Sequence, residues 1–276
     1  MTTATPARRK KKKTESQAEL SFEAPEPDSA ADAAPQPEAA DAPAPKRGGK
    51  SRKPADATSM AKKQREISVS EFFSKNRHLL GFDNPAKALL TTIKEAVDNS
   101  LDACEEAGIA PDIRVEVHQL AEDRFRVVVA DNGPGIVKKQ VPKIFGQLLY
   151  GSKFHRLRQS RGQQGIGISA AGMYGQLTTG KPVVIRSKTG ARKPAHVFEI
   201  HLDTRKNQPV VSLDQEFEWD GVDHGTQVEV ELEATYRKGA RSVDAYLQQT
   251  GLANPHLRLE YHAPKDEPVV FERATK

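Results

Sequence analysis

Apolar residues recur every three or four positions between residues 69 and 108, and this spacing predicts two consecutive amphipathic helices. A capping box that begins at Ser68 marks the start of the first helix, and Gly81 marks its end. Pro85 is expected in the first turn of the second helix, which should end at Gly108. The apolar stripe of the second helix consists of Leu89, Ile93, Val97, Leu101 and Cys104.

Beyond residue 112 the pattern is mainly that of β-strands. Residues 125–130 contain a continuous apolar run, which is typical of a buried strand. Further helices are expected around residues 141–149, from Gly167 to about residue 177, and near residues 242–250. Helices set beside a mixed, mostly antiparallel sheet predict an α+β two-layer sandwich. The other expected strands cover residues 113–118, 183–187, 196–202, 210–217, 226–232, 257–261 and 269–271.

The first 66 residues differ in composition from the rest of the chain. They are rich in Ala, Pro, Glu and Lys, and their only aromatic residue is Phe22. Such a segment buries too little apolar surface to offset the entropy lost on ordering. We therefore expect a disordered tail over residues 1–66 and a single folded domain over residues 67–276.

Charge is concentrated in the tail. The chain has 42 Lys and Arg against 37 Asp and Glu, of which residues 1–66 hold 14 and 10, leaving 28 against 27 for residues 67–276. A nearly neutral domain gives little support for a DNA-binding surface of its own. The basic run at residues 8–13 could contact nucleic acid, or could simply keep a flexible arm in solution.

Features that would indicate secretion or a membrane are missing from the sequence. Cys104 is the single cysteine, which excludes an intrachain disulfide and favours a reducing compartment. No apolar stretch is long enough to span a bilayer, and the N-terminus lacks the apolar core of a signal peptide. We therefore expect a soluble, cytoplasmic protein without a membrane partner.

The second predicted helix carries the first candidate for chemistry. Glu95 and Asn99 lie one turn apart, so their side chains project from the same face. An asparagine amide oxygen suits a hydrated magnesium ion, and a nearby carboxylate can deprotonate water. The same pair also occurs on ordinary solvated helix faces. The acidic neighbours Asp98 and Asp102, on a helix that also carries an apolar stripe, favour the functional interpretation.

Asp131 follows the predicted buried strand directly. A carboxylate at that position could accept a hydrogen bond from the amino group of adenine. Gly133 and Gly135 would let the backbone approach a base without a Cβ clash, although an ordinary Asn-Gly-Pro turn is the alternative. Thr226, after Gly225, could bond to Asp131 or to a water at the adenine edge, or could simply begin a strand.

Glycines recur between residues 162 and 167, immediately before a predicted helix. The free N–H groups and the dipole of such a helix can hold phosphate groups. The loop is not a Walker A sequence, because no Lys-Ser or Lys-Thr pair follows. The candidate residues of the loop and of the first helical turn are Gly162, Gln163, Gln164, Gly165, Ile166, Gly167, Ile168 and Ser169.

Taken in this order, the motifs resemble those of the GHKL ATPases, the family of gyrase B, MutL, heat-shock chaperones and sensor histidine kinases. Residues 81–90, 95–103 and 161–168 more specifically resemble the B subunits of type IIB DNA topoisomerases, and the likeness extends from about residue 67 to the end. It implies a GHKL fold with ATP and Mg2+ as cofactors. By this resemblance Glu95 is the general base and Asn99 the magnesium ligand.

The resemblance also implies that the other motif residues bind ATP. Ser152 and Lys153 are similar to additional nucleotide contacts of the family, although Lys153 could be an ordinary solvated lysine. The implied activity is that of an ATP-hydrolysing B subunit whose ATP-driven dimerisation gates DNA strand passage and relaxes supercoils. The implied partner is an A subunit in an A2B2 heterotetramer, through which the protein meets DNA. The segment before Phe72 is expected to reach across the dimer.

The family also implies helical and transducer domains, and neither is expected within this sequence. Because a transducer lysine completes the γ-phosphate site in the family, we expect this chain to bind ATP and dimerise but to turn over slowly. Two alternatives stay open. One is a stand-alone GHKL ATPase, and the other is a nucleotide-switched dimerisation module with negligible turnover.

Overall fold

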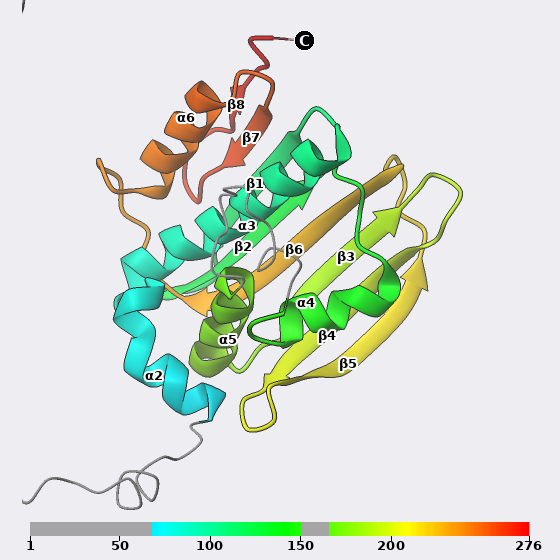
Figure 1. The fold of residues 1–276 in the computed structure, drawn as a ribbon. Helices are drawn as coiled ribbons and strands as arrows, with labels where there is room; N and C mark the ends of the chain where they lie inside the picture. The colour runs from blue at the N-terminus through cyan, green and yellow to red at the C-terminus, as the bar shows by residue number, and fades with distance from the viewer. Residues whose placement is uncertain (1–67, 151–165, 276) are drawn as a thin grey trace, which may run out of the picture. The chain divides into compact units, whose positions relative to one another are not determined.

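One layer of the fold is an eight-stranded sheet, and helices α3, α4 and α5 lie across one of its faces (Figure 1). The computed structural model describes residues 68–150 and 166–275, so the expected tail over residues 1–66 lies outside the described residues. The strand order is β5-β4-β3-β6-β2-β1-β7-β8, in which β1 and β7 are parallel and the other described pairs are antiparallel. The predicted α+β sandwich is confirmed. The strands are β1 Asp112–Gln119, β2 Arg124–Asp131, β3 Val183–Thr189, β4 Ala195–Asp203, β5 Gln208–Phe217, β6 His224–Glu233, β7 Arg258–His262 and β8 Val269–Phe271.

The first two helices begin and end where the sequence predicts. Helix α2, Val69–Leu80, is capped by the Ser68 hydroxyl, which accepts a hydrogen bond from the Glu71 N–H at 3.2 Å. Helix α3, Pro85–Ala107, is capped in the same way by Asn84. Both helices end at glycines with positive φ, 84° at Gly81 and 68° at Gly108, where a residue with a Cβ would be strained.

The remaining helices are η1 Lys138–Gln140, α4 Val141–Gly146, α5 Gly167–Thr179 and α6 Val243–Ala253. Helix α4 is shorter than the stretch predicted around residues 141–149. The Leu148 N–H donates to Asn207 Oδ1 at 2.8 Å, and the Leu148 carbonyl accepts from Asn207 Nδ2 at 3.2 Å. These two bonds to a distant loop replace the helical bonds that residues 147–149 would otherwise make.

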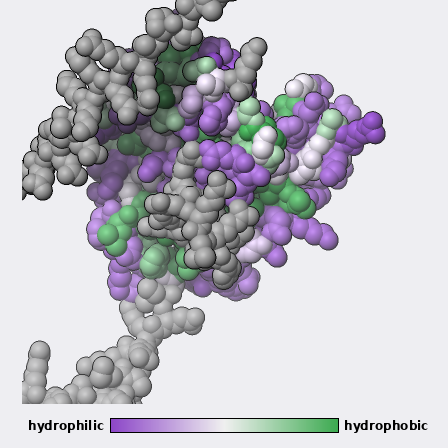
Figure 2. Space-filling model, turned by 45° about the horizontal axis from the view of Figure 1, so that its top comes forward, coloured by the Kyte–Doolittle hydropathy of each residue, from purple (hydrophilic) through white to green (hydrophobic). Residues whose placement is uncertain are grey.

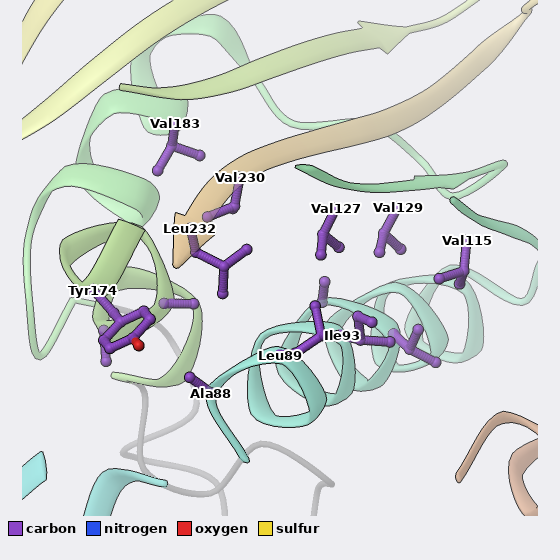
Figure 3. Packing of buried hydrophobic residues seen from close by; sticks show 14 of the residues in the cluster. Ala88, Leu89, Ile93, Val115, Val127, Val129, Tyr174, Val183, Val230 and Leu232 are labelled. Atoms are coloured by element: carbon purple, nitrogen blue, oxygen red, sulfur yellow. The ribbon is translucent and has the colours of Figure 1, made fainter. Parts of the chain in front are cut away.

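The hydrophobic core lies between α3 and the central strands, where α3 residues face Val127, Val129 and Leu232 (Figure 3). The five residues of the predicted apolar stripe are each at most 1% exposed, which confirms the stripe. Cys104 belongs to it, and burial raises the pKa of its thiol to about 12. Cys104 is therefore a small core residue, and α3 is held firmly on the sheet.

The opposite face of the sheet carries paired charges. Arg126 Nε on β2 lies 3.2 Å from Glu229 Oε1 on β6, and Arg186 Nη1 on β3 lies 3.6 Å from Oε2 of the same carboxylate.

The surface drawn in Figure 2 is largely hydrophilic, with small and scattered hydrophobic patches. Among the described helices, none combines the length and the apolar character needed to cross a bilayer.

Candidate functional site

A cavity of about 300 Å3 opens between α3, the end of β2 and the beginning of α5. Its walls come from segments that are far apart in the sequence and that the fold brings together. Several residues singled out from the sequence line it, and they are Glu95, Asn99, Asp131, Gly135, Gly167, Ile168 and Thr226. The candidate base, metal ligand, base reader and part of the phosphate loop thus face one space.

Asp131 ends β2 and is held by three hydrogen bonds. Its Oδ1 accepts from the backbone N–H of Gly133 at 2.9 Å and from that of Thr226 at 3.2 Å. Its Oδ2 accepts from the hydroxyl of Ser100 on α3 at 2.8 Å. The Thr226 bond follows from the β2–β6 register, which pairs Asp131 with Thr226. The sequence suggested the Thr226 hydroxyl as the donor to Asp131, and in the structure its backbone N–H makes that bond.

The surroundings of Asp131 act on its charge in two directions. Burial raises the pKa of the carboxyl, while the hydrogen bonds from Ser100, Gly133 and Thr226 and the nearby His224 lower it, and burial prevails. Each carboxylate oxygen has about two acceptor sites. Because Oδ1 already receives two N–H groups, Oδ2 is the oxygen with capacity for a further donor facing the cavity.

The loop after Asp131 is fixed by its backbone. Gly135 has a φ of 71°, and a Cβ there would overlap the carbonyl of Lys188. A Cβ at Gly133 would lie 2.9 Å from Asp131 Oδ1. The Ile136 N–H donates to the Ser187 hydroxyl on β3 at 2.7 Å. Both glycines are therefore required for close packing, and the loop presents Asp131 in one orientation.

Glu95 and Asn99 line the cavity from α3, one turn apart. The Glu95 carboxylate packs so closely on Gly167, the first residue of α5, that a Cβ at Gly167 would overlap it. A carboxylate thus sits beside the N-terminus of a helix, where N–H groups without helical acceptors favour anions. This arrangement sets a potential base beside a potential phosphate site.

Among the described residues, no side chain caps the N-terminus of α5, where Ile166 is the N-cap residue. The hydroxyl of Ser169 donates to the carbonyls of Ile144 at 2.9 Å and Gln147 at 3.2 Å, so it joins α5 to the α4 region. Ser169 can therefore offer a phosphate its backbone N–H. The other expected contacts lie outside the described residues, and they are Ser152, Lys153, Gly162, Gln163, Gln164 and Gly165.

The donor set can be tested for a metal ion. Among residues 68–150 and 166–275, no group of three or more His, Cys, Asp and Glu side chains is arranged to hold one. Asn99 lines the cavity, and its side chain has one amide oxygen that could serve as a ligand. Magnesium usually keeps several waters and takes few protein ligands alongside substrate phosphates, so this set fits Mg2+ better than an ion that needs a complete protein cage.

Three residues that the sequence did not single out support this site. Ser100 holds Asp131, Ser187 holds the loop at Ile136, and His224 Nδ1 lies 2.8 Å from the carbonyl of Gly133. Ser100 could have been noticed as a polar residue beside the apolar stripe of α3. The other two reach the loop only through strand pairing, which leaves no local signal in the sequence.

The chain is similar to curated proteins named as the B subunit of type 2 DNA topoisomerase 6. It is 55% identical to the protein of Methanococcoides burtonii over 220 residues, which are 79% of this chain and 35% of that protein. It is 52% identical to the protein of Archaeoglobus fulgidus over 217 residues, 78% of this chain and 36% of that protein. The matched region thus spans about a third of the length of these relatives.

The fold is also that of a solved structure described as the topoisomerase IV ATP binding domain of Francisella tularensis in complex with a small molecule inhibitor. The TM-score is 0.50 at 17% sequence identity, over 75% of this chain and 95% of that one. The family model described as "Histidine kinase-, DNA gyrase B-, and HSP90-like ATPase" matches residues 84–236, which contain Glu95, Asn99, Asp131 and Thr226. The chain therefore belongs to the histidine kinase-, DNA gyrase B- and HSP90-like ATPase family.

Proposed function

We propose that the cavity binds ATP with Mg2+ and that the chain hydrolyses the bond between the β- and γ-phosphates. The observation that carries this proposal is the juxtaposition of two anchors in one cavity. Asp131 Oδ2 can accept a hydrogen bond from the adenine amino group, and the N-terminus of α5, which no described side chain caps, can receive phosphates beside Glu95. The membership of the chain in an ATPase family supports the same assignment.

In this proposal Glu95 removes a proton from the attacking water, and ADP and phosphate are the products. Asn99 would hold Mg2+, which when bound neutralises charge on the phosphate oxygens. The backbone N–H groups at Gly167, Ile168 and Ser169 would orient the phosphates. Ser152, Lys153 and residues 162–166 are proposed as further contacts on the basis of sequence.

The decisive experiment separates binding from hydrolysis. Glu95→Gln is expected to abolish ATP hydrolysis while leaving the Kd for ATP within a few-fold, because the lost group acts on the water. Glu105→Gln is the matched control, since Glu105 is an exposed carboxylate on the same helix and does not line the cavity. Hydrolysis that survives Glu95→Gln would refute the role of Glu95. A wild-type chain that binds no ATP would refute the proposal as a whole.

We further propose that the chain is the ATP-binding part of a B subunit of a type IIB topoisomerase. Identities of 51% to 55% over about 220 residues with proteins of that name support this. In such an assembly, ATP would bring two copies together, with the segment before Phe72 reaching across. The dimer would gate strand passage in an A2B2 heterotetramer whose A subunit contacts and cuts DNA. The complex would work in the cytoplasm.

This broader proposal needs its own test, with an A subunit. Sedimentation with a non-hydrolysable ATP analogue should convert the full chain to a dimer. A chain that starts at Glu71 should remain monomeric, because it lacks the segment assigned to the partner. ATP-dependent dimerisation without any association with an A subunit would instead favour the stand-alone ATPase or the nucleotide-switched module.

A further inference from the structure

His224, at the beginning of β6, contacts the loop of residues 132–136 that follows Asp131. Its Nδ1 is 2.8 Å from the carbonyl oxygen of Gly133. A carbonyl can only accept, so Nδ1 carries the hydrogen in this contact. His224 is partly buried and is not among the residues that line the cavity. Its effect on a ligand must therefore be indirect, through the loop and through Asp131.

The bond from His224 holds the middle of the loop. At the first end of the loop, Asn132 Oδ1 accepts from the Asp112 N–H and Asn132 Nδ2 donates to the Ala110 carbonyl. At the other end, the Ser187 hydroxyl accepts from the Ile136 N–H. Among the described residues, no other donor reaches the Gly133 carbonyl. Without His224, the described hydrogen bonds of Gly133 would be reduced to the one from its N–H to Asp131 Oδ1.

Gly133 transmits this restraint to Asp131. Its carbonyl accepts from His224, and its N–H donates to Asp131 Oδ1 at 2.9 Å. That N–H is one of two that occupy Oδ1 and so turn Oδ2 toward the cavity. If Gly133 moves, the carboxylate loses a donor and gains freedom to rotate.

We propose that His224 is a positioning residue that sets the preference of the site for adenine, by fixing Gly133 and through it the carboxylate of Asp131. This inference rests on the proposed binding of ATP with Asp131 at the adenine amino group. His224 does not line the cavity, so in this proposal it contacts neither the base nor the phosphates. Its substitution should therefore change the discrimination between bases and leave the phosphate contacts intact.

Three variants of the full chain test this inference. His224→Phe keeps an aromatic ring and removes the donor. His224→Asn restores a donor, because its Nδ2 stands the same number of bonds from the backbone as histidine Nδ1. His196→Phe is the control, because His196 lies on β4 with a partly buried ring and makes no hydrogen bond to the loop. The Kd values for ATP and GTP with Mg2+ are measured by calorimetry, together with Tm.

The expected result is a selective loss. His224→Phe should raise the Kd for ATP about fivefold, which corresponds to the free energy of one hydrogen bond. The Kd for GTP should change by less than twofold. His224→Asn should return the ratio of the two Kd values to within twofold of wild type, and His196→Phe should leave that ratio unchanged. A ratio that His224→Phe does not alter, in a chain that prefers ATP, refutes this inference alone. A wild-type chain that binds ATP no better than GTP refutes this inference and the assignment of Asp131 to the adenine amino group, whereas a wild-type chain that binds no ATP refutes the proposed function.

Discussion

Replacing Asp131 by asparagine should invert the preference of the cavity between adenine and guanine. Two backbone N–H groups, from Gly133 and Thr226, point at Oδ1. Both groups donate, so they require an acceptor oxygen at that position, and an asparagine must place its Oδ1 there and its Nδ2 where Oδ2 stood. The Ser100 hydroxyl, now the donor to Oδ2 at 2.8 Å, can rotate to accept from that amide. The fold should therefore tolerate the change.

The magnitude follows from the bond that is lost. The adenine amino group would meet a donor instead of a charged acceptor, which costs about 1.5–3 kcal/mol for a hydrogen bond to a charged group. This corresponds to an ATP affinity roughly 10 to 150 times weaker. Guanine carries an acceptor at the same place, O6, so GTP should bind at least as well to Asp131→Asn as to the wild-type chain.

Calorimetric titration of both chains with ATP and with GTP, each with Mg2+, measures the two ratios directly. Circular dichroism and Tm establish that the variant is folded. Equal weakening of ATP and GTP would show that Asp131 supports the loop without reading the base. In that case the assignment of Asp131 would have to be abandoned.

The same substitution has a pH-dependent effect on stability. Burial raises the pKa of Asp131 above the ordinary value of 3.8, so the native state binds this proton more tightly than the unfolded chain does. The contribution of Asp131 to the free energy of unfolding therefore falls as pH rises through the interval between 3.8 and the raised pKa. Because asparagine does not titrate, the Tm of Asp131→Asn relative to wild type should be higher at pH 7 than at pH 4. An offset in Tm that is the same at both pH values would contradict the direction of the shift.

Three other outcomes follow from the packing. Gly167→Ala should abolish hydrolysis in a γ-phosphate release assay, because its Cβ would displace the Glu95 carboxylate, and activity above half of wild type would contradict this. Cys104, with a thiol pKa of about 12, should resist a thiol reagent at pH 8 in the native chain and react in guanidinium chloride, whereas rapid native labelling would show that the α3 stripe opens. Tyr246→Phe removes the hydroxyl that donates to Asp98 Oδ1 at 3.0 Å. The free energy of unfolding, measured by urea titration, should fall by about 1–3 kcal/mol. An unchanged value would show that this hydrogen bond does not stabilise the fold.

The helices could be predicted closely because their signals are local. The caps at Ser68 and Gly108 and the buried stripe of α3 depend on residues within a few positions of each other. The sequence predicts too late an end for α4, because the residue that bonds Leu148 there, Asn207, lies 59 positions away. The strand order was also beyond reach, since no local pattern shows that β6 inserts between β3 and β2.

The candidate site shows the same contrast between features with a local sequence signal and features that depend on distant residues. Glu95, Asn99 and Asp131, which line one cavity, could be singled out from sequence because each lies within a short motif. The groups that orient Asp131 come from α3 and from the opposite strand, and they meet only when β2 pairs with β6. A backbone N–H, such as that of Thr226, leaves no trace in residue identity. Sequence therefore predicts which residues line the candidate site better than it predicts the groups that hold them.

The central claim, that this cavity holds ATP between Asp131 and the N-terminus of α5, is tested most directly by a crystal structure with a non-hydrolysable ATP analogue and Mg2+. We expect the adenine amino group within hydrogen-bond distance of Asp131 Oδ2 and the phosphates against the N–H groups that begin at Gly167. We also expect the metal ion on Asn99. An analogue that occupies another part of the surface, or that lies in the cavity with its base turned away from Asp131, would contradict the account.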